Sequence, residues 1–384
     1  MADFTAEVMV IGGGIAGASA AYELSKTHDV ILLEQEAELA FHTTSRSAAL
    51  YIENEGGPVF HRLSTASRSF LENPPDDLDA PLLSPRGCLN IGVPEIADEL
   101  RANMAAATEV TPSIRFLEQA DVLELCPVLR PERATCGVYE PNAMTVDVMA
   151  LHQLFVRGAR KRATQVQRSA RVTALQRTDD TWRATTAAGS VEAAVVVNAA
   201  GAWGDVVGTL AGAQPLGLTP CRRTAFTTTV DVDPSAWPFI YNPRVDATCY
   251  FQPESGNQLM CSLSDQTPSE PCDARPEEID IARAINNINE LTTLNIRSVN
   301  TTWAGLRTFA PDRHPVFGWD DTVDGFCWAV GQGGCGIVTA RAAGEAVASV
   351  VRGAALPSTI TELGLTVTDL APRRDTASRF GIAS

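Results

Sequence analysis

The stretch EVMVIGGGIAG, residues 7–17, joins a short apolar run to three glycines in the order G-x-G-x-x-G. The apolar run has the length of a buried strand, and Gly12 allows the tight turn that follows it. Gly14 lets a phosphate group approach the backbone, and Gly17 allows close packing of the next helix, whose N-terminus favours negative charge. The stretch therefore predicts a strand, a turn and a helix that together bind a dinucleotide.

Two further features bear on which dinucleotide is bound. An apolar run at Val30–Leu33 ends at Glu34, whose carboxylate can accept hydrogen bonds from a ribose in either NAD or FAD. Near the other end, WAVGQGGCG at 328–336 forms a second glycine turn ahead of a segment predicted to be helical. A second helix N-terminus suits the far end of a cofactor, where it would stabilise negative charge on a reduced flavin. The two turns together favour FAD.

Composition restricts the class of protein. The chain has 384 residues, which is typical of two domains or of one domain with a large insertion. Its net charge of −16 would repel nucleic acid. No run approaches 18 apolar residues, so no membrane span is expected. The nine cysteines show no CxxC pair, so no metal site is expected. An odd cysteine count without a secretory leader predicts a cytoplasmic location.

The order of apolar runs predicts a chain that leaves its first domain and returns to it. We expect a doubly wound α/β FAD-binding domain of the Rossmann type, made of residues 1–80, 145–215 and 305–384. We expect a second, substrate-binding α+β domain on a mostly antiparallel sheet, made of residues 81–144 and 216–304. The expected strands are 7–11, 30–33, 170–176, 181–186, 191–198, 224–230, 258–263 and 326–330, and the expected helices are 18–25, 61–71, 151–162, 279–293 and 337–352.

Several longer motifs resemble one family. The chain is similar, nearly end to end, to the FAD-dependent D-amino-acid oxidases and dehydrogenases (the DAO family), and most of all to bacterial D-arginine dehydrogenases. The motifs that carry the resemblance are IGGGIAGAS, HTTSRSAA, PLLSPR, VVVNAAGAW, PLGLTPCRRTAF, CYFQP, TWAGLRTFAPD and GQGGCGI. The resemblance implies that FAD, expected to be non-covalent, contacts Gly12, Gly14, Ile15, Ala16, Gly17, Glu34, Ser45, Arg46, Ser47, Ala48, Val172, Gly201, Gly333, Gly334, Cys335, Gly336 and Ile337.

The resemblance also implies a site for a small amino-acid substrate. Arg223, Tyr250 and Arg307 would hold its carboxylate, and the carbonyl of Gly334 would accept from its amine. Arginine suits the first role because its planar group of donors matches a carboxylate and stays charged when partly buried. Arg307 lies in WAGLRTF, an apolar strand in which an unpaired guanidinium would be costly. A structural ion pair at either arginine remains the alternative.

The positions expected to recognise the substrate side chain depart from the D-arginine dehydrogenase pattern. A glutamate that pairs with the substrate guanidinium is replaced here by Gly87–Cys88, and a histidine and a lid tyrosine are replaced by Leu50 and Glu55. A pocket formed by Leu50, Glu55 and Cys88 predicts a preference for neutral, medium-sized side chains. Glu55 could instead supply a replacement carboxylate from the lid.

The predicted activity is oxidative deamination of a D-amino acid to a 2-oxo acid through an imino acid, with hydride transfer from Cα to flavin N5. Oxidation of a secondary amine or of a 2-hydroxy acid on the same scaffold is the leading alternative, and a flavin monooxygenase is a more distant one. A non-catalytic flavin-binding protein is the alternative from another class. The sequence leaves open whether O₂, a quinone or another acceptor takes the electrons.

Overall fold

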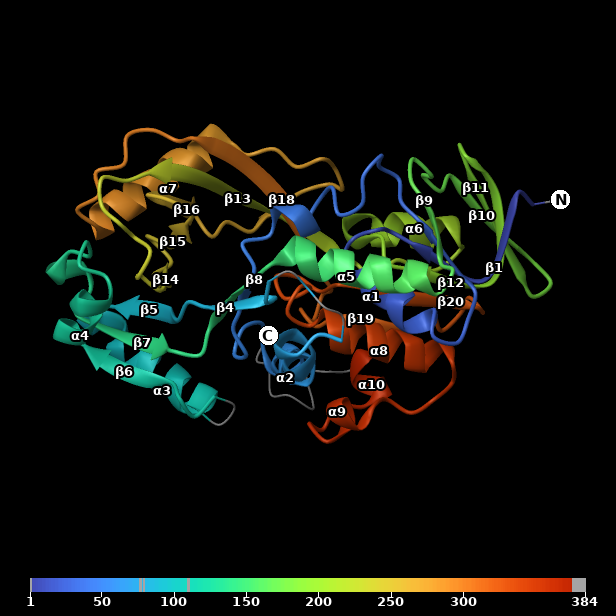
Figure 1. Cartoon of the computed structure of the whole chain (residues 1–384), viewed down its shortest axis with the longest axis horizontal. Coiled ribbons are helices and arrows are strands. Elements are labelled where there is room, and N and C mark those ends of the chain that lie inside the picture. The colour runs from blue at the N-terminus through green and yellow to red at the C-terminus, as the bar shows by residue number, and fades with distance from the viewer. Residues whose placement is uncertain (1, 76–77, 79, 109–110, 375–384) are drawn as a thin grey trace.

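The computed structural model describes residues 2–75, 78, 80–108 and 111–374. It has two parts, each built on its own β-sheet, which lie side by side along the long axis of the molecule (Figure 1). The part on the right of Figure 1 contains the first strand and the last long helix, and the part on the left contains the middle of the chain. The chain passes between the two parts several times, as the sequence predicts.

The sheet of the first part has parallel strands at its centre. β1 (Phe4–Ile11) lies between β2 (Val30–Leu33) and β12 (Gly189–Asn198), and all three run parallel. β9 pairs parallel with β2 on the side away from β1. β20 pairs parallel with the C-terminal residues of β12, also on the side away from β1. The remaining strands pair antiparallel at the edges. Their bounds are β9 (Gln165–Gln167), β10 (Ala174–Thr178), β11 (Thr181–Thr186), β19 (Val316–Trp319) and β20 (Phe326–Val330).

Helices cover both faces of this sheet. Val8 and Val10 of β1 belong to a core shared with α1 (Ile15–Leu24) and α8 (Ala340–Val351). Met9 and Ile11, which point the other way because side chains alternate along a strand, pack with Val207 of α6 (Gly204–Leu210). Burial on both faces explains why β2 and the end of β1 read as continuous apolar runs. Also packed around this sheet are α2 (Pro58–Glu72), α5 (Val148–Lys161), α9 (Ser358–Thr361) and α10 (Val367–Leu370).

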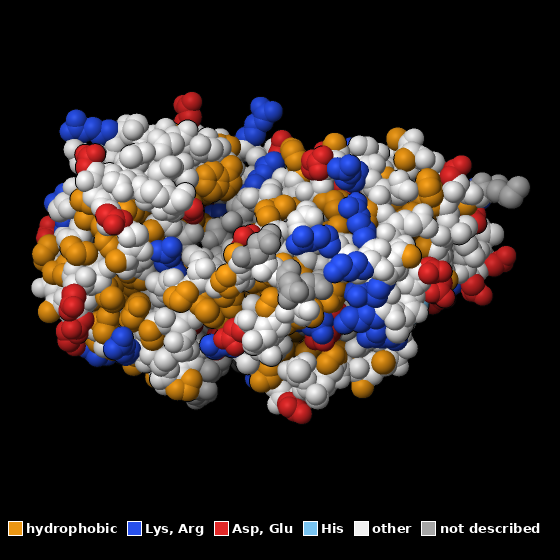
Figure 2. Space-filling view, viewed as in Figure 1, with side chains coloured by type: hydrophobic (Ala, Val, Ile, Leu, Met, Phe, Trp, Pro, Cys, Tyr) orange, Lys and Arg blue, Asp and Glu red, His pale blue; other side chains and the backbone are white. Residues whose placement is uncertain are grey.

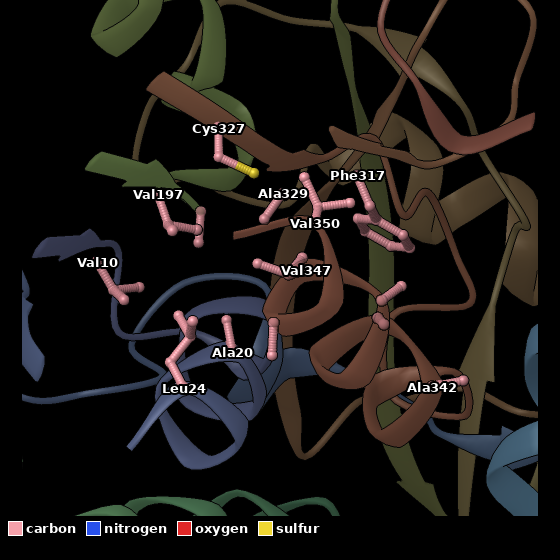
Figure 3. Packing of buried hydrophobic residues seen from close by; sticks show 14 of the residues in the cluster. Val10, Ala20, Leu24, Val197, Phe317, Cys327, Ala329, Ala342, Val347 and Val350 are labelled. Atoms are coloured by element: carbon pink, nitrogen blue, oxygen red, sulfur yellow. The ribbon is translucent and has the colours of Figure 1, made fainter. Parts of the chain in front are cut away.

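Small side chains bring α1 and α8 unusually close together (Figure 3). A methyl group placed on Gly344 of α8 would lie 2.6 Å from the backbone oxygen of Ser19 in α1. Such a distance is far below van der Waals contact, so only glycine fits at this crossing. The core on this face includes Val10, Ala20, Leu24, Val197, Phe317, Cys327, Ala329, Ala342, Val347 and Val350. The close packing fixes α8 against the strand and turn that bear the first glycine motif.

The sheet of the second part is mostly antiparallel, as predicted. Its order is β17-β13-β16-β15-β14-β5-β7-β6, with β18 on the other side of β13. The parallel pair β14–β5 joins the two separate stretches of sequence that build this part. Helices α3 (Ala97–Thr108), α4 (Gln119–Leu125) and α7 (Glu278–Leu291) pack on it. The strands are β5 (Cys88–Gly92), β6 (Arg115–Glu118), β7 (Cys136–Glu140), β13 (Thr219–Thr229), β14 (Phe239–Asn242), β15 (Cys249–Glu254), β16 (Gln258–Ser262), β17 (Thr267–Pro268) and β18 (Thr301–Phe309).

Some element bounds differ from those predicted. The closing helix begins at Ala340 and not at Ile337, because residues 336–339 form turns before it. Helix α1 begins at Ile15 and not at Ala18. Strand β18 stays in the second sheet as far as Phe309, beyond the predicted boundary at 304. A small sheet, not predicted from the sequence, is formed by β3 (Leu50–Tyr51), β4 (Leu83–Pro85) and β8 (Met144–Val146). Residues 375–384 of the predicted first domain lie outside the described residues.

The surface is unevenly charged. Arg157, Arg160 and Lys161 are exposed on α5, and Figure 2 shows basic side chains gathered over α5 and α1 on the visible face. This band carries positive charge although the whole chain is strongly acidic. Among the described residues, no helix is long and apolar enough to cross a membrane.

Candidate functional site

The turn between β1 and α1 has the backbone geometry that the glycine motif predicts. Gly12 has a φ of 111°, and a methyl group on it would lie 2.3 Å from the backbone oxygen of Ala199. A methyl group on Gly17 would lie 1.8 Å from the backbone oxygen of Gly12. Helix α1 has Gly14 as its N-cap, which has no side chain of its own to accept from the first N–H groups, and the Thr44 hydroxyl accepts from only one of them, that of Ile15. The helix N-terminus therefore presents backbone N–H groups and a positive dipole end to the space beside it, as an anion site requires.

Glu34 lies where the motif predicts, at the end of β2. Its carboxylate is buried, accepting from the backbone N–H of Gly13 at 2.7 Å and from that of Glu36 at 2.9 Å. Burial raises the pKa of Glu34, and these two hydrogen bonds oppose the rise. The carboxylate thus braces the glycine turn. A hydrogen bond to a ribose stays a prediction, which the second lone pair on each oxygen allows.

A cavity of about 520 Å³ runs from this turn to the second part of the molecule. Arg223, Tyr250 and Arg307 line it at the end formed by the second sheet. The predicted cofactor residues that line it are Gly12, Gly14, Ile15, Ala16, Glu34, Arg46, Ser47, Ala48, Val172, Gly201, Gly333, Gly334, Gly336 and Ile337. An elongated cavity with a glycine-cradled helix N-terminus and a buried carboxylate beside it fits FAD.

Three residues predicted to contact FAD lie outside this cavity. Gly17 is buried beneath the turn, where its role is helix packing. Ser45 is exposed, and its hydroxyl donates to the backbone oxygen of Phe41. Cys335 is buried behind the second glycine turn, and its thiol donates to the backbone oxygen of Glu55 at 3.7 Å. Burial raises the pKa of Cys335 well above its usual value, so the thiol stays protonated.

Arg46 lines the cavity, but its guanidinium is held by the second part of the molecule. It donates to the backbone oxygens of Ala274 at 3.0 Å and Ala304 at 2.8 Å, and it pairs with Asp273 at 2.6 Å. The backbone oxygen of Arg46 in turn accepts from the indole of Trp303 at 3.1 Å. The guanidinium therefore joins the two parts of the molecule, and the contact of Arg46 with FAD stays a prediction.

Other cavity residues were missed from the sequence. His42 and Trp203 line the cavity with ring centroids 4.7 Å apart, and Nε2 of His42 lies 2.9 Å from Oε1 of Glu36. Thr44 is buried, and its hydroxyl oxygen accepts from the backbone N–H of Ile15 at 3.0 Å. The run HTTS directly after the first βαβ unit was the available signal, because hydroxyl side chains commonly satisfy exposed backbone donors at helix starts.

At the other end of the cavity, β13 and β18 place two arginines near each other. Arg223 is opposite Gly305 in the register, and Arg307 is opposite Cys221, two residues away along the same pair of strands. Nε of Arg223 donates to the backbone oxygen of Asp265 at 2.7 Å, and its guanidinium carbon lies 5.9 Å from the ring centroid of Tyr250. Burial and the nearby charge of Arg307 lower the pKa of Arg223. Two cations held this close favour an anion between them.

The second glycine turn meets this arginine pair. A methyl group on Gly334 would lie 2.9 Å from Nη1 of Arg307, so the backbone and the guanidinium are in direct contact. Arg307 forms no ion pair within the part of the chain that the structure describes. The structure thus brings Arg223, Tyr250, Arg307 and Gly334 together, as the resemblance implies. Their roles toward a substrate stay predictions.

The neighbouring arginine has a structural role. Arg222 points to the opposite face of β13, where it pairs with Glu277 and, at 2.9 Å, with the buried Asp280. The alternation of side chains along the strand separates the two adjacent arginines. Arg222 therefore forms a structural ion pair, whereas the roles of Arg223 and Arg307 stay predictions.

The three residues predicted to form a side-chain pocket do not line the cavity together. Leu50 and Cys88 are buried in an apolar cluster with Ala143, and burial raises the pKa of the Cys88 thiol well above its usual value. Glu55 is exposed beside Gly334 instead. None of the three is among the residues that line the cavity, and their contact with a substrate side chain stays a prediction.

Comparison with known proteins agrees with this geometry. The profile of the family described as FAD dependent oxidoreductase (DAO) matches residues 7–350. The chain belongs to the DAO family. The match begins at the first strand and ends in α8, so it includes both glycine turns and the arginine pair.

Individual relatives share parts of the sequence. Dimethylglycine dehydrogenase from rat mitochondria (Rattus norvegicus) is 31% identical over 212 residues, which is 54% of this chain and 25% of that protein. This chain therefore matches about a quarter of that relative's length. Glycine oxidase from Bacillus licheniformis is 26% identical over 367 residues, covering 90% of this chain and 93% of that protein. The crystal structure of glycine oxidase from Geobacillus kaustophilus superposes with a TM-score of 0.84 at 20% identity, covering 97% and 99% of the two chains.

Proposed function

We propose that this DAO-family protein oxidises the carbon–nitrogen bond of a small amino acid, and that its preferred substrates are glycine-type amines with a substituted nitrogen. The observation that carries the proposal is the meeting of Arg223, Arg307 and Tyr250 at the cavity end that also contains Gly334. Two guanidinium groups and a phenol match the oxygens of one carboxylate. FAD, when bound along the rest of the cavity, supplies the two-electron acceptor for the oxidation.

The chain's own residues would act mainly by orientation. Arg223 is held from behind by the backbone oxygen of Asp265, and the carboxylate of Asp265 accepts from the backbone N–H of Thr224 at 2.8 Å. A rigid carboxylate clamp fixes the substrate Cα relative to the glycine turn, and such positioning is a large part of catalysis when no proton relay is needed. The carbonyl of Gly334 is the nearest backbone acceptor for the amine.

Two observations favour a glycine-type or N-methyl substrate over the D-amino acid predicted first. Leu50 and Cys88 are packed against Ala143 and do not line the cavity, so the side-chain pocket expected for a D-amino acid is not part of this cavity. The relatives named above are a dimethylglycine dehydrogenase and glycine oxidases. A substituent on nitrogen does not need a pocket for a side chain on Cα.

Flavin absorbance under anaerobic conditions tests the proposal. Purified protein reconstituted with FAD is mixed with glycine, N-methylglycine, N,N-dimethylglycine, D-alanine, D-leucine, D-arginine and glycolate. We expect fast bleaching by one or more of the N-methylated glycines, slower bleaching by D-alanine and none by D-arginine. Bleaching by glycolate alone, or by D-arginine faster than by any glycine derivative, would overturn the proposal. Reoxidation of the bleached protein with O₂, a quinone or a dye then identifies the class of electron acceptor.

A further inference from the structure

Glu55 lies in the loop between β3 and α2, at the point where this loop meets the arginine pair. A methyl group placed on Gly334 would lie 3.6 Å from Oε1 of Glu55 and 2.9 Å from Nη1 of Arg307. The carboxylate and the guanidinium therefore flank the same backbone position of the glycine turn. Glu55 is exposed and, within the described ranges, forms no ion pair. Its charge is thus available to a ligand in the space beside Gly334.

The loop holds Glu55 there through contacts on both sides of it. The Cys335 thiol donates to the backbone oxygen of Glu55. Gly56 has a φ of 88°, and a methyl group on it would lie 2.6 Å from Sγ of Cys335, so the loop backbone packs directly on the glycine turn. On the other side Glu53 is buried and accepts from Arg68 at 2.9 Å. Because the loop is held on both sides of Glu55, the backbone of this residue is fixed relative to the glycine turn.

The charged side chains around this space match a zwitterion, which carries a carboxylate and a positively charged nitrogen. Arg223 and Arg307 supply two positive charges at the carboxylate end, and Tyr250 supplies a phenol there. A substrate carboxylate between the arginines places its nitrogen only two bonds from the carboxyl carbon, and thus close to Gly334. A protonated nitrogen at that point would be repelled by Arg307 unless a negative charge stood nearby. Glu55 is the carboxylate whose position next to Gly334 supplies that charge.

We propose that Glu55 is the counter-ion for the substrate nitrogen, so that the site selects ammonium carboxylates over carboxylates without a charged nitrogen. This inference rests on the proposed function, since it takes Arg223 and Arg307 as the carboxylate clamp. It assigns to Glu55 a place at the reacting end of the substrate instead of the side-chain pocket expected from the sequence. It also gives a physical reason why a 2-hydroxy acid should bind poorly.

The alternative is that Glu55 binds a cation at the far end of a longer substrate, because it also lies near Cys88. Burial is the main cause of the raised pKa of the Cys88 thiol, and the charges of Glu140 and Glu55 add to it. The direct approach to Gly334 and the neighbouring Arg307 favour the nitrogen next to the carboxylate. The two placements differ in which ligands lose affinity when Glu55 becomes neutral.

Binding of two isosteric ligands tests the proposal. Trimethylammonioacetate and 3,3-dimethylbutanoate have the same shape and carboxylate and differ only in the charged nitrogen. Without a nitrogen lone pair, the first is not oxidised. Each is titrated into the FAD-loaded protein and followed by the change in flavin absorbance, and glycine against propanoate serves as a smaller pair. We expect wild-type protein to prefer the ammonium ligand about tenfold, a ratio that corresponds to about 1.4 kcal/mol.

Three variants test whether Glu55 causes this ligand preference. Glu55→Gln should bring the preference close to one without weakening propanoate, and Glu55→Asp should restore most of it. Glu38→Gln, which removes an exposed carboxylate outside the cavity, is the matched control and should leave the ratio unchanged. An unchanged ratio in Glu55→Gln, or no preference in the wild type, overturns the proposal. Loss of D-arginine binding in Glu55→Gln with the isostere ratio intact places Glu55 at a distal cation and also overturns it.

Failure of the proposed function would look different from failure of this inference. If the site does not bind amino acids at all, no amine bleaches the wild-type flavin and neither carboxylate perturbs its spectrum. If only the role of Glu55 is wrong, amines bleach the wild-type flavin while Glu55→Gln keeps the wild-type ligand preference.

Discussion

Replacing Arg222 and Arg223 one at a time distinguishes the role of each of these adjacent arginines. Arg223→Met removes a buried guanidinium from the cavity, whereas Arg222→Met removes one from the opposite face of the same strand. Both changes remove one positive charge and keep a long apolar side chain. If the alternation along β13 decides function, Arg223→Met should lose activity and Arg222→Met should lose stability.

The magnitudes follow from what each side chain contacts. Truncating one member of a buried charge pair costs about 2–5 kcal/mol. Because Arg307 repels Arg223 and stays in place to bind the carboxylate, we take about 3 kcal/mol for Arg223→Met, which is roughly a 150-fold fall in kcat/KM. Arg222→Met leaves Asp280 buried without its partner, so the free energy of unfolding should fall by about 3 kcal/mol. The exposed Glu277 adds little to that loss.

Three measurements on each variant test this reasoning. Visible absorbance gives FAD content, steady-state kinetics with the best bleaching substrate give kcat/KM, and urea denaturation gives the free energy of unfolding. Arg223→Met should keep FAD and stability, and Arg222→Met should keep kcat/KM within about twofold, because the Arg222 guanidinium pairs with Glu277 and Asp280 on the other face of β13. Equal losses of kcat/KM in the two variants would refute the argument, and so would near-normal kinetics in Arg223→Met.

Three further changes probe the cofactor end and the packing. Gly17→Ala should abolish FAD retention and lower the yield of folded protein, because its methyl group would collide with the backbone oxygen of Gly12; a yellow, stable variant would contradict the packing described. Glu34→Gln should raise the Kd for FAD about tenfold, since a charge-assisted hydrogen bond is worth about 1.5–3 kcal/mol, and fluorescence titration of apoprotein measures it. Burial raises the pKa of Glu140 from 4.5 to about 7, so the folded state binds more protons than the unfolded state between these values and stability falls as pH rises through them. Glu140→Gln should remove that slope and be more stable than wild type at pH 8 by up to about 3 kcal/mol in urea denaturation, and identical pH profiles would show that this carboxyl is not buried as described.

The central strands of the first sheet were predicted well because burial on both faces leaves a clear signal, whereas β9 and β19 were not predicted and the strand expected at 170–176 lies at Ala174–Thr178. Val30–Leu33 and Phe326–Val330 have the predicted bounds, and each is apolar throughout. Helix starts were placed less well. The glycine turn at 331–336 runs into three more turn residues before α8, and nothing in GIVTA distinguishes turn from first helical residues.

The candidate site could be predicted where chemistry and motif coincide. Arg223, Tyr250 and Arg307 meet in one cavity because β13, β15 and β18 of the second sheet carry them; β18 pairs with β13, and β16 lies between β13 and β15. The side-chain pocket could not be predicted, because whether Leu50 and Cys88 line a cavity or a core depends on the packing of Ala143, which is distant in sequence from Leu50. Arg46 was expected to contact FAD, and its guanidinium also donates to backbone oxygens more than 200 residues away in the sequence.

The pairing of β20 with β12, and of the second glycine turn with the first part, has a consequence for biosynthesis. The cavity is lined by Gly12, Gly14, Ile15 and Ala16 and also by residues of the second glycine turn, so it is incomplete until the ribosome has added that turn. Contacts between segments so far apart close late, because a long loop must first lose its freedom. Cofactor capture should therefore wait until the second glycine turn has left the ribosome, and nascent chains stalled before residue 326 should be protease-sensitive whether or not FAD is present.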